Sequence, residues 1–434
     1  MTASTAVRTT LPPGPRLPAG IQTLLFGSAR HEYFPRWQRR FGHTFTVSLA
    51  AGRKLVVITR PADIRTVFAG SATVFHAGEA NDVLAPVLGE HAIVLSDGDA
   101  HQRLRRLVMP AFTAAALRGY QDLIGQVAIA DAESWPTGQL VRAHDRMHAL
   151  TLEVILRVVF GVSEEERLAV LRPLVTDVVN GQHAAVLGGF FPPLRAFRRY
   201  RRFQARRAEL NAWLDGEIAD RRRAGAVDGT DVLSRLLQPA DGELSSAELR
   251  DQLFNLLLAG HETTATALGW TLHELARRPQ VLRAAQRAAD DNDEDYLIAL
   301  VKEATRLHPV IYVIGRRLAQ PAQVGDYLLP AGTVVAPGIG LVQAAEENYP
   351  EPAEFRPARF LDGQPATNTW IPFGGGVRRC LGVGFAQLEA SLVLREVLAR
   401  YDITADRPAP EATRVHGMTM MPAGGAQVRV SARR

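Results

Sequence analysis

The sequence predicts a mainly α-helical fold with a small β-rich portion, and three observations favour this fold class. Apolar residues recur at helical spacing along most of the chain. One such segment, residues 246–278, is long enough to cross a whole molecule. Stretches rich in valine, isoleucine and threonine are short, and we expect them mainly within residues 40–60 and 310–335. With 434 residues, 47% hydrophobic and 22% charged, the chain can build a large core.

Residues 1–20 are expected to form an irregular leader. They contain two arginines and no acidic residue, a composition that also occurs in transit peptides. Four prolines between positions 12 and 18 would, however, break the amphipathic helix that a transit peptide needs. We find neither an internal repeat nor a long Gly/Ser linker, so a single domain is expected over residues 21–434.

Three regions have the composition of β-strands. Residues 44–49 and 55–59 flank the dipeptide Ala51-Gly52 and predict a β-hairpin. A second β-region is expected at residues 318–335, around a Pro-Ala-Gly turn, and a third at residues 427–430. The remaining segments between these regions are predicted to be helical.

The longest helical segment begins after Ser245, which can form a capping box with Glu248. It stops at Pro279, so residues 246–278 would span roughly 50 Å at about 1.5 Å per residue. Its centre carries the sequence HETT, residues 261–264, directly after an apolar run. Polar groups buried at that depth need compensation, which makes these residues candidates for function.

The composition excludes several classes of protein. Cys380 is the only cysteine, so no intramolecular disulfide can form, which fits a reducing cytoplasm. No apolar run approaches the ~18–20 residues of a membrane span. We therefore expect a cytoplasmic protein without a membrane span. Only two of the 50 basic residues are lysines, and a genome biased toward arginine codons explains that skew without a function.

An arginine-rich segment at residues 194–207 could, taken alone, bind nucleic acid. Phe197, Tyr200 and Phe203 recur in it at three-residue spacing and predict one apolar helix face, with the arginines on the other. A solvated helix face explains this pattern better, so no nucleic-acid partner is expected.

Cys380 lies in a loop rich in glycine and arginine, with the sequence FGGGVRRCLG. Arg378 and Arg379 favour the thiolate, as does the N-terminus of a helix predicted to begin just after the cysteine. Nothing nearby supplies further metal ligands, which disfavours tetrahedral zinc. A single stabilised thiolate with neighbouring arginines suits the axial position of a haem iron, with arginines pairing with the propionates. The alternative is a buried structural cysteine.

The same loop resembles the haem-binding signature of the cytochrome P-450 superfamily at each fixed position: Phe373, Gly376, Arg378, Cys380 and Gly382. The resemblance implies the P-450 fold, a helical bundle around a haem with small β-sheets. It also implies haem b (iron protoporphyrin IX) as the cofactor, with the Cys380 thiolate as the ligand of the metal.

Further segments resemble motifs of this family in the family's order. Glu303 and Arg306 match its E-x-x-R helix motif, and as i,i+3 neighbours they can form an ion pair. Arg359 lies in the segment FRPARF, which resembles the meander that follows. That Arg359 completes a Glu–Arg–Arg network is implied by the resemblance alone. The segment AGHETT, residues 259–264, resembles the oxygen-activation motif.

The HETT sequence also has a competing interpretation. The zinc motif H-E-x-x-H needs a second histidine where Ala265 stands, so zinc hydrolysis is disfavoured. The family resemblance implies that Thr263 and Glu262 are catalytic and supply protons for oxygen activation, with Gly260 loosening the helix. Otherwise Thr263 would hydrogen-bond the preceding turn and Glu262 would be exposed.

Basic residues elsewhere are candidates for binding the haem propionates. His101 and Arg105 are i,i+4 on a helix predicted to end near Pro110, so both can point at one anion. In the strand after the E-x-x-R helix, Arg316 and Arg317 compete for a similar role. We favour Arg316 because its offset to the following turn agrees better with the family.

The resemblance implies a haem-thiolate monooxygenase that inserts one oxygen atom of O2 into an apolar small molecule. Relatives line their substrate pocket at the positions of Leu258, Ala259, Ile311 and Val313. The domain is expected to use the whole length, so electrons should come from a separate ferredoxin or flavodoxin-type donor with its reductase. The alternative is a haem-thiolate protein that binds a ligand or senses gas without turnover.

A basic docking surface for that electron donor is also expected. Arg379 lies beside Cys380, and Arg103 and Arg106 lie on another side of their helix from His101 and Arg105. The three arginines are therefore predicted to face solvent near the cysteine and attract an acidic partner.

Overall fold

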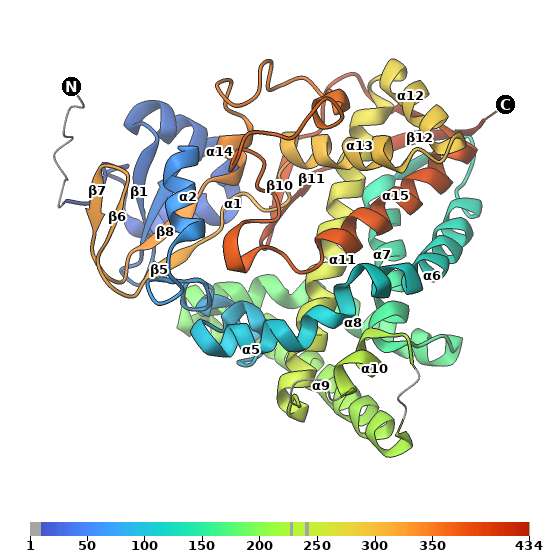
Figure 1. The fold of residues 1–434 in the computed structure, drawn as a ribbon, viewed down its shortest axis with the longest axis horizontal. Helices are drawn as coiled ribbons and strands as arrows, with labels where there is room; N and C mark the ends of the chain where they lie inside the picture. The colour runs from blue at the N-terminus through green and yellow to red at the C-terminus, as the bar shows by residue number, and fades with distance from the viewer. Residues whose placement is uncertain (1–9, 226–228, 239–242, 434) are drawn as a thin grey trace.

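The computed structural model describes residues 10–225, 229–238 and 243–433. It confirms the mainly helical fold with small sheets. Most of the strands lie on one side: β1, β2 and β5–β8 gather there with α1 and α2, while most helices form the rest of the molecule together with β12 (Figure 1). α11 passes through the middle of the molecule between these parts. The expected leader is irregular where it is described, up to Pro18, and residues 1–9 lie outside the described part.

The helices account for most of the chain. Their bounds are α1 Ala19–Phe41, α2 Pro61–Ala69, α3 Ala77–Ala80, α4 Ala85–Leu88, α5 Gly98–Val108, α6 Ala114–Glu133, α7 Ala143–Phe160, α8 Glu165–Phe190, α9 Arg198–Ala224, α10 Val232–Leu237, α11 Ser246–Ala276, α12 Pro279–Asp290, α13 Glu294–Leu307, α14 Ile339–Gln343 and α15 Val383–Arg400.

Within the described residues, the strands form four small sheets with the orders β1-β2-β8-β5-β3, β4-β12-β9, β10-β11 and β6-β7. The predicted hairpin is present as β1 and β2, paired antiparallel with Phe45 opposite Val57. The strand bounds are β1 Thr44–Ser48, β2 Lys54–Ile58, β3 Phe75–His76, β4 Leu140–Arg142, β5 Arg316–Leu318, β6 Ala322–Val324, β7 Tyr327–Leu329, β8 Val334–Pro337, β9 Tyr401–Ala405, β10 Thr413–His416, β11 Thr419–Pro422 and β12 Gln427–Ala432.

The central helix α11 forms as the sequence predicts, although it ends at Ala276 rather than at residue 278. The Ser245 side chain accepts from the backbone N–H of Glu248, and the Glu248 side chain accepts from the Ser245 N–H, so both halves of the capping box are present. The helix packs against α7, α13 and α15, and most of its residues are buried. This burial fixes the direction in which each polar residue of its centre points.

The arginine-rich helix departs from its predicted pattern at both ends. Phe197 precedes α9 and is 63% exposed, so it is not part of an apolar helix face, whereas Phe203 is buried as predicted. Arg207 is buried rather than solvated, and its guanidinium stacks on the ring of Phe254, 3.4 Å from the centroid.

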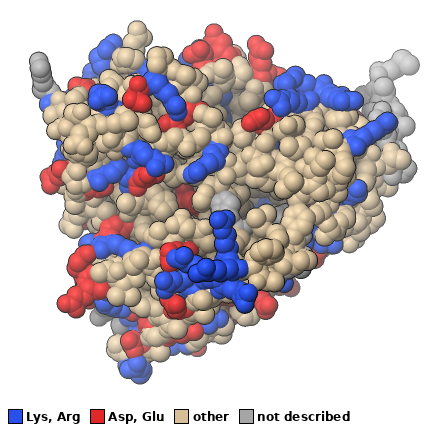
Figure 2. Space-filling view, turned by 180° about the vertical axis from the view of Figure 1, so that it is seen from behind, with Lys and Arg blue, Asp and Glu red and all other residues tan. Residues whose placement is uncertain are grey.

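Acidic and basic side chains are interspersed over the face shown in Figure 2.

Candidate active site

The loop that carries Cys380 is held by its own backbone. The Cys380 N–H donates to the carbonyl of Phe373 at 3.0 Å, and the Arg379 N–H donates to Gly376 O at 3.0 Å. Gly376 has φ +64°, and a Cβ there would lie 2.0 Å from the Phe68 carbonyl oxygen. Two constraints therefore require glycine: the left-handed backbone and the close approach of the C-terminal end of α2.

The Cys380 side chain is exposed to open space at the start of α15. Burial raises the pKa of the Cys380 thiol overall, and the Gly382 N–H and the guanidinium groups of Arg105 and Arg379 offset only part of that rise. These donors favour the thiolate. At Gly382 a Cβ would meet nothing within 4 Å, so the backbone beside the sulfur is open on that side.

Basic side chains gather beside this loop. His101, Arg316 and Arg378 line one small hollow together with Asp97. Burial and then Arg378 lower the pKa of His101 to about 4, and burial and then Arg378 lower the pKa of Arg316 to about 10. Basic side chains that lower each other's pKa lack a negative charge between them. A bound anion such as a haem propionate would supply that charge. The open thiol and this cluster together fit a haem.

Two of the predicted propionate ligands have other partners in the structure. Arg378 forms an ion pair with Asp97, whose carboxylate also accepts from the N–H groups of Ala77, Gly78 and Glu79. Arg105 donates to the carbonyl of Arg379 at 3.0 Å and lies close enough to Cys380 for the two charges to interact. Arg317 is half-buried and faces Glu79 at 3.7 Å, whereas Arg316 points into the hollow.

The centre of α11 opens on one side only. Ala259 is exposed and Thr263 half-buried, whereas the residues that follow Thr263 up to Ala276 are buried. The Thr263 hydroxyl donates to the carbonyl of Ala259 at 2.6 Å, the back-bond that the sequence left open as an alternative. The hydroxyl oxygen keeps its lone pairs and can still accept a hydrogen bond from the open side.

Glu262, expected to be exposed if it had no function, is instead buried. Burial raises the pKa of its carboxyl to about 7, against the side-chain hydrogen bonds of Gln182 and Thr419. Gln182 Nε2 donates to Glu262 Oε2 at 2.8 Å. A carboxyl with a pKa near 7 can hold a proton or release it at neutral pH.

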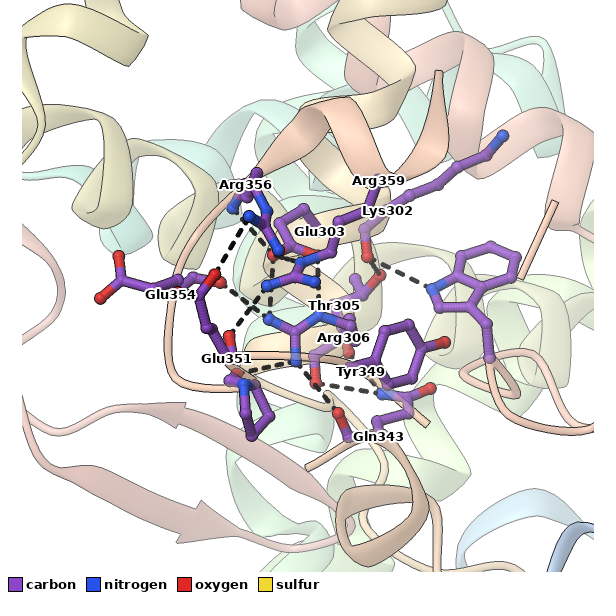
Figure 3. Close-up of polar contacts among 12 residues, drawn as sticks. Lys302, Glu303, Thr305, Arg306, Gln343, Tyr349, Glu351, Glu354, Arg356 and Arg359 are labelled. Carbon is purple, nitrogen blue, oxygen red and sulfur yellow. Dashed lines mark hydrogen bonds and ion pairs between the residues drawn. The ribbon is translucent and has the colours of Figure 1, made fainter. Parts of the chain in front are cut away.

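Glu303, Arg306 and Arg359 lie together in a buried network (Figure 3). Arg306 Nε donates to Glu303 Oε2 at 2.7 Å, and Nη2 donates to Oε1 at 2.9 Å. Arg359 Nε reaches Glu303 Oε1 at 3.3 Å. Three backbone carbonyls take the remaining N–H groups of Arg306, those of Gln343, Pro352 and Glu354. The network ties α13 to the segment that leads into the cysteine loop.

The predicted pocket residues lie in two segments. Leu258 and Ala259 are at the open part of α11, while Ile311 and Val313 are half-buried between α13 and β5. Ile311 forms an isolated antiparallel bridge with Thr419 of β11. The hairpin β10–β11 therefore joins the pocket segment to the neighbourhood of Glu262.

One surface prediction holds only in part. The Arg103 side chain is 43% exposed, but its guanidinium is paired: it donates to Glu248 Oε1 at 2.6 Å and to the carbonyl of Glu243 at 2.8 Å. It thereby fixes the start of α11. Arg106 and Arg379 are exposed as expected.

Sequence reasoning missed the side chains that reach the site from distant segments. Asp97, Gln182, Thr419 and His416 belong to this group. None lies in a motif, and no local pattern marks them, because their roles depend on how the chain folds back.

Comparisons with known proteins agree with this geometry. A family model described as Cytochrome P450 matches residues 11–430. Cytochrome P450 135A1 of Mycobacterium tuberculosis (strain ATCC 25618 / H37Rv) is 45% identical, over 98% of this chain and 96% of that protein. Cytochrome P450 135B1 of Mycobacterium bovis (strain ATCC BAA-935 / AF2122/97) is 41% identical, over 98% and 92%. The structure of retinoic acid bound cyanobacterial CYP120A1 is similar with a TM-score of 0.86 and 25% identity, over 99% of this chain and 100% of that one.

None of the helices in the described part has the length and apolar character needed to cross a membrane.

Proposed function

Since the chain belongs to the cytochrome P450 family, whose members bind haem b through a cysteine thiolate, we propose that Cys380 is the iron ligand of a haem-thiolate monooxygenase. Cys380 is the only cysteine of the sequence, so no other residue can supply the thiolate. One observation carries the proposal: an exposed thiol next to the Gly382 N–H and the guanidinium groups of Arg105 and Arg379, beside a cluster of basic side chains that suits the propionates.

Haem, when bound, supplies the reduction of O2 and the transfer of one oxygen atom to the substrate. The chain's own residues supply position and protons. His101, Arg316 and Arg378 would hold the propionates, with Arg105 beside the thiolate. Glu262 holds a proton close to neutral pH, and Thr263 offers a hydroxyl at the open face of α11. Gly376 and Gly382 have no side chain, so the backbone of the cysteine loop stays accessible beside Cys380.

The substrate is proposed to be an apolar small molecule. Leu258, Ala259, Ile311 and Val313 present apolar side chains at the two segments described above. The structural neighbour was solved with retinoic acid, a largely hydrocarbon molecule. We propose insertion of one oxygen atom into such a substrate, with electrons from a separate ferredoxin or flavodoxin-type donor. Residues 21–434 are proposed to form the single domain that does this.

The test uses the purified, haem-loaded protein. The reduced carbon monoxide complex should give the thiolate-type spectrum, and C380S should lose it. Turnover of NAD(P)H with surrogate redox partners should then yield oxygenated product from an apolar substrate library. A thiolate spectrum without turnover of any substrate would instead support the ligand-binding or gas-sensing alternative. An unchanged spectrum in C380S would contradict the assignment of the ligand.

A further inference from the structure

Glu262 lies where three elements meet. It projects from α11 toward α8, which supplies Gln182, and toward the hairpin β10–β11. Its Oε2 accepts from Gln182, and its Oε1 lies 3.4 Å from Nε2 of His416. The Glu262 side chain is 9% exposed, whereas that of His416 is 25% exposed. The imidazole therefore lies between a buried carboxyl and more accessible space.

The fold of the hairpin holds His416 in this position. His416 and Thr419 are directly opposed in the antiparallel register, so their side chains lie on the same face. The Thr419 hydroxyl donates to the His416 carbonyl at 2.9 Å, and the same side chain also acts on the Glu262 carboxyl. Two buried donors fix the hairpin from outside: Arg30 Nη2 to Met418 O at 2.9 Å, and Trp270 Nε1 to Met420 O at 2.8 Å.

The other groups around Glu262 are not suited to exchange a proton with it. Gln182 and Thr419 do not titrate. His261, the preceding residue on α11, faces α7 instead, where its Nδ1 lies 3.0 Å from the Thr151 hydroxyl and its ring packs on His148. Among the described residues around this carboxyl, His416 is the ionisable side chain that approaches it.

We propose that His416 is a positioning residue that supplies protons to Glu262. In its protonated form the imidazolium gives the proton on Nε2 to Glu262 Oε1, which leaves a neutral imidazole and a neutral carboxyl. The imidazole then takes up a proton from hydronium or a buffer acid in bulk solvent, and Glu262 is ready to release its own toward the oxygen site. The inference rests on the proposed function, because oxygen reduction is what consumes the protons.

The pairing is tested first without turnover. Infrared difference spectra, with E262Q as the reference, follow the protonated carboxyl of Glu262 as the pH is raised. Loss of a neighbouring cation should raise the midpoint of that titration in H416Q by about one pH unit. Reciprocally, NMR of labelled histidine should show the pKa of His416 falling in E262Q, because the carboxylate that favours the imidazolium is removed. R414Q, which removes an exposed charge two residues away on the same strand, should change neither titration.

Turnover then tests the direction of the effect. H416Q should lower the product formed per NAD(P)H and raise the solvent deuterium isotope effect, while the carbon monoxide spectrum stays of the thiolate type. In the E262Q background the same substitution should add nothing, because His416 acts through Glu262. Independent titrations of the two groups, or an equal loss in the E262Q background, would overturn the proposal. A protein without monooxygenase activity would refute the proposed function and leave the titrations to decide the pairing.

Discussion

Replacing Arg306 should destabilise the protein more than any surface substitution of an arginine. The guanidinium is fully buried, and each of its five N–H groups has an acceptor: both oxygens of Glu303 and three backbone carbonyls. In Arg306→Leu the three carbonyls lose their donor. The buried Glu303 keeps only the Arg356 backbone N–H, at 2.9 Å, and Arg359.

The size of the effect follows from that list of contacts. Breaking a buried ion pair by removing one partner costs about 3–5 kcal/mol. Each carbonyl that stays dry and unpaired adds about 1–3 kcal/mol. Since a folded protein is stable by only about 5–15 kcal/mol, R306L should unfold at a much lower urea concentration and hold haem poorly. R306K keeps the charge but has three donors for five acceptors. Its free energy of unfolding should therefore be lower by about 2 kcal/mol or more.

Urea unfolding followed by far-UV circular dichroism measures the change in the free energy of unfolding. The spectrum of the reduced carbon monoxide complex reports on the haem site. Arg356→Ala is the matched control, because the Arg356 guanidinium pairs with Glu351 at 3.1 Å with both side chains about half exposed or more. That substitution keeps the backbone N–H and should cost about 0–1 kcal/mol. An R306L protein as stable as the control would refute the argument that full hydrogen bonding makes this buried pair essential.

Three further predictions concern the oxygen site and its electron supply. T263A should bind haem and substrate normally but divert reducing equivalents to hydrogen peroxide, measured as peroxide released per NAD(P)H; full coupling would contradict a role for the hydroxyl. The pKa of Glu262 rises from 4.5 to about 7 on folding, so its stabilisation is complete below pH 4.5 and is lost as the pH rises through 7. The stability of the wild type relative to E262Q should therefore fall by about 3 kcal/mol over that range in urea titrations, and a constant difference would argue against the shift. Reversing Arg106 and Arg379 to Glu should slow the first electron transfer from an acidic ferredoxin, measured by stopped flow, and wild-type rates should fall as salt screens charges beyond about 8–10 Å. Rates insensitive to both changes would exclude that docking face.

The features that the sequence predicts correctly are local ones. The capping box at Ser245 needs a partner three residues away, and the hairpin β1–β2 needs only a turn between two short strands. Glu303 and Arg306 are likewise i,i+3 neighbours on α13. In each case the interacting groups are fixed by the geometry of one element, so a pattern of a few residues is enough to place them.

What the sequence does not predict depends on contacts between distant segments. Arg103 has the spacing of a surface residue on α5, yet Glu248 lies 145 positions away in sequence and meets it in space. Asp97, in the turn before α5, pairs with Arg378 from 281 positions away, and no motif indicates this partner. Such partners carry no helical or strand period, and only the packing of the elements brings them together.

Glu262 and Thr263 are neighbours on α11 but have different surroundings. Successive residues of an α-helix point about 100° apart, so the two side chains leave the helix in different directions. The structure shows the consequence: Thr263 faces the open side of α11, while Glu262 lies between α8 and the β10–β11 hairpin. Under the proposed function, a proton held by Glu262 would move around the helix to the Thr263 side, by rotation of the side chain or through water. Gln182 and His416 hold the carboxyl away from the Thr263 side, so under the proposed function these two residues would control when the proton leaves Glu262.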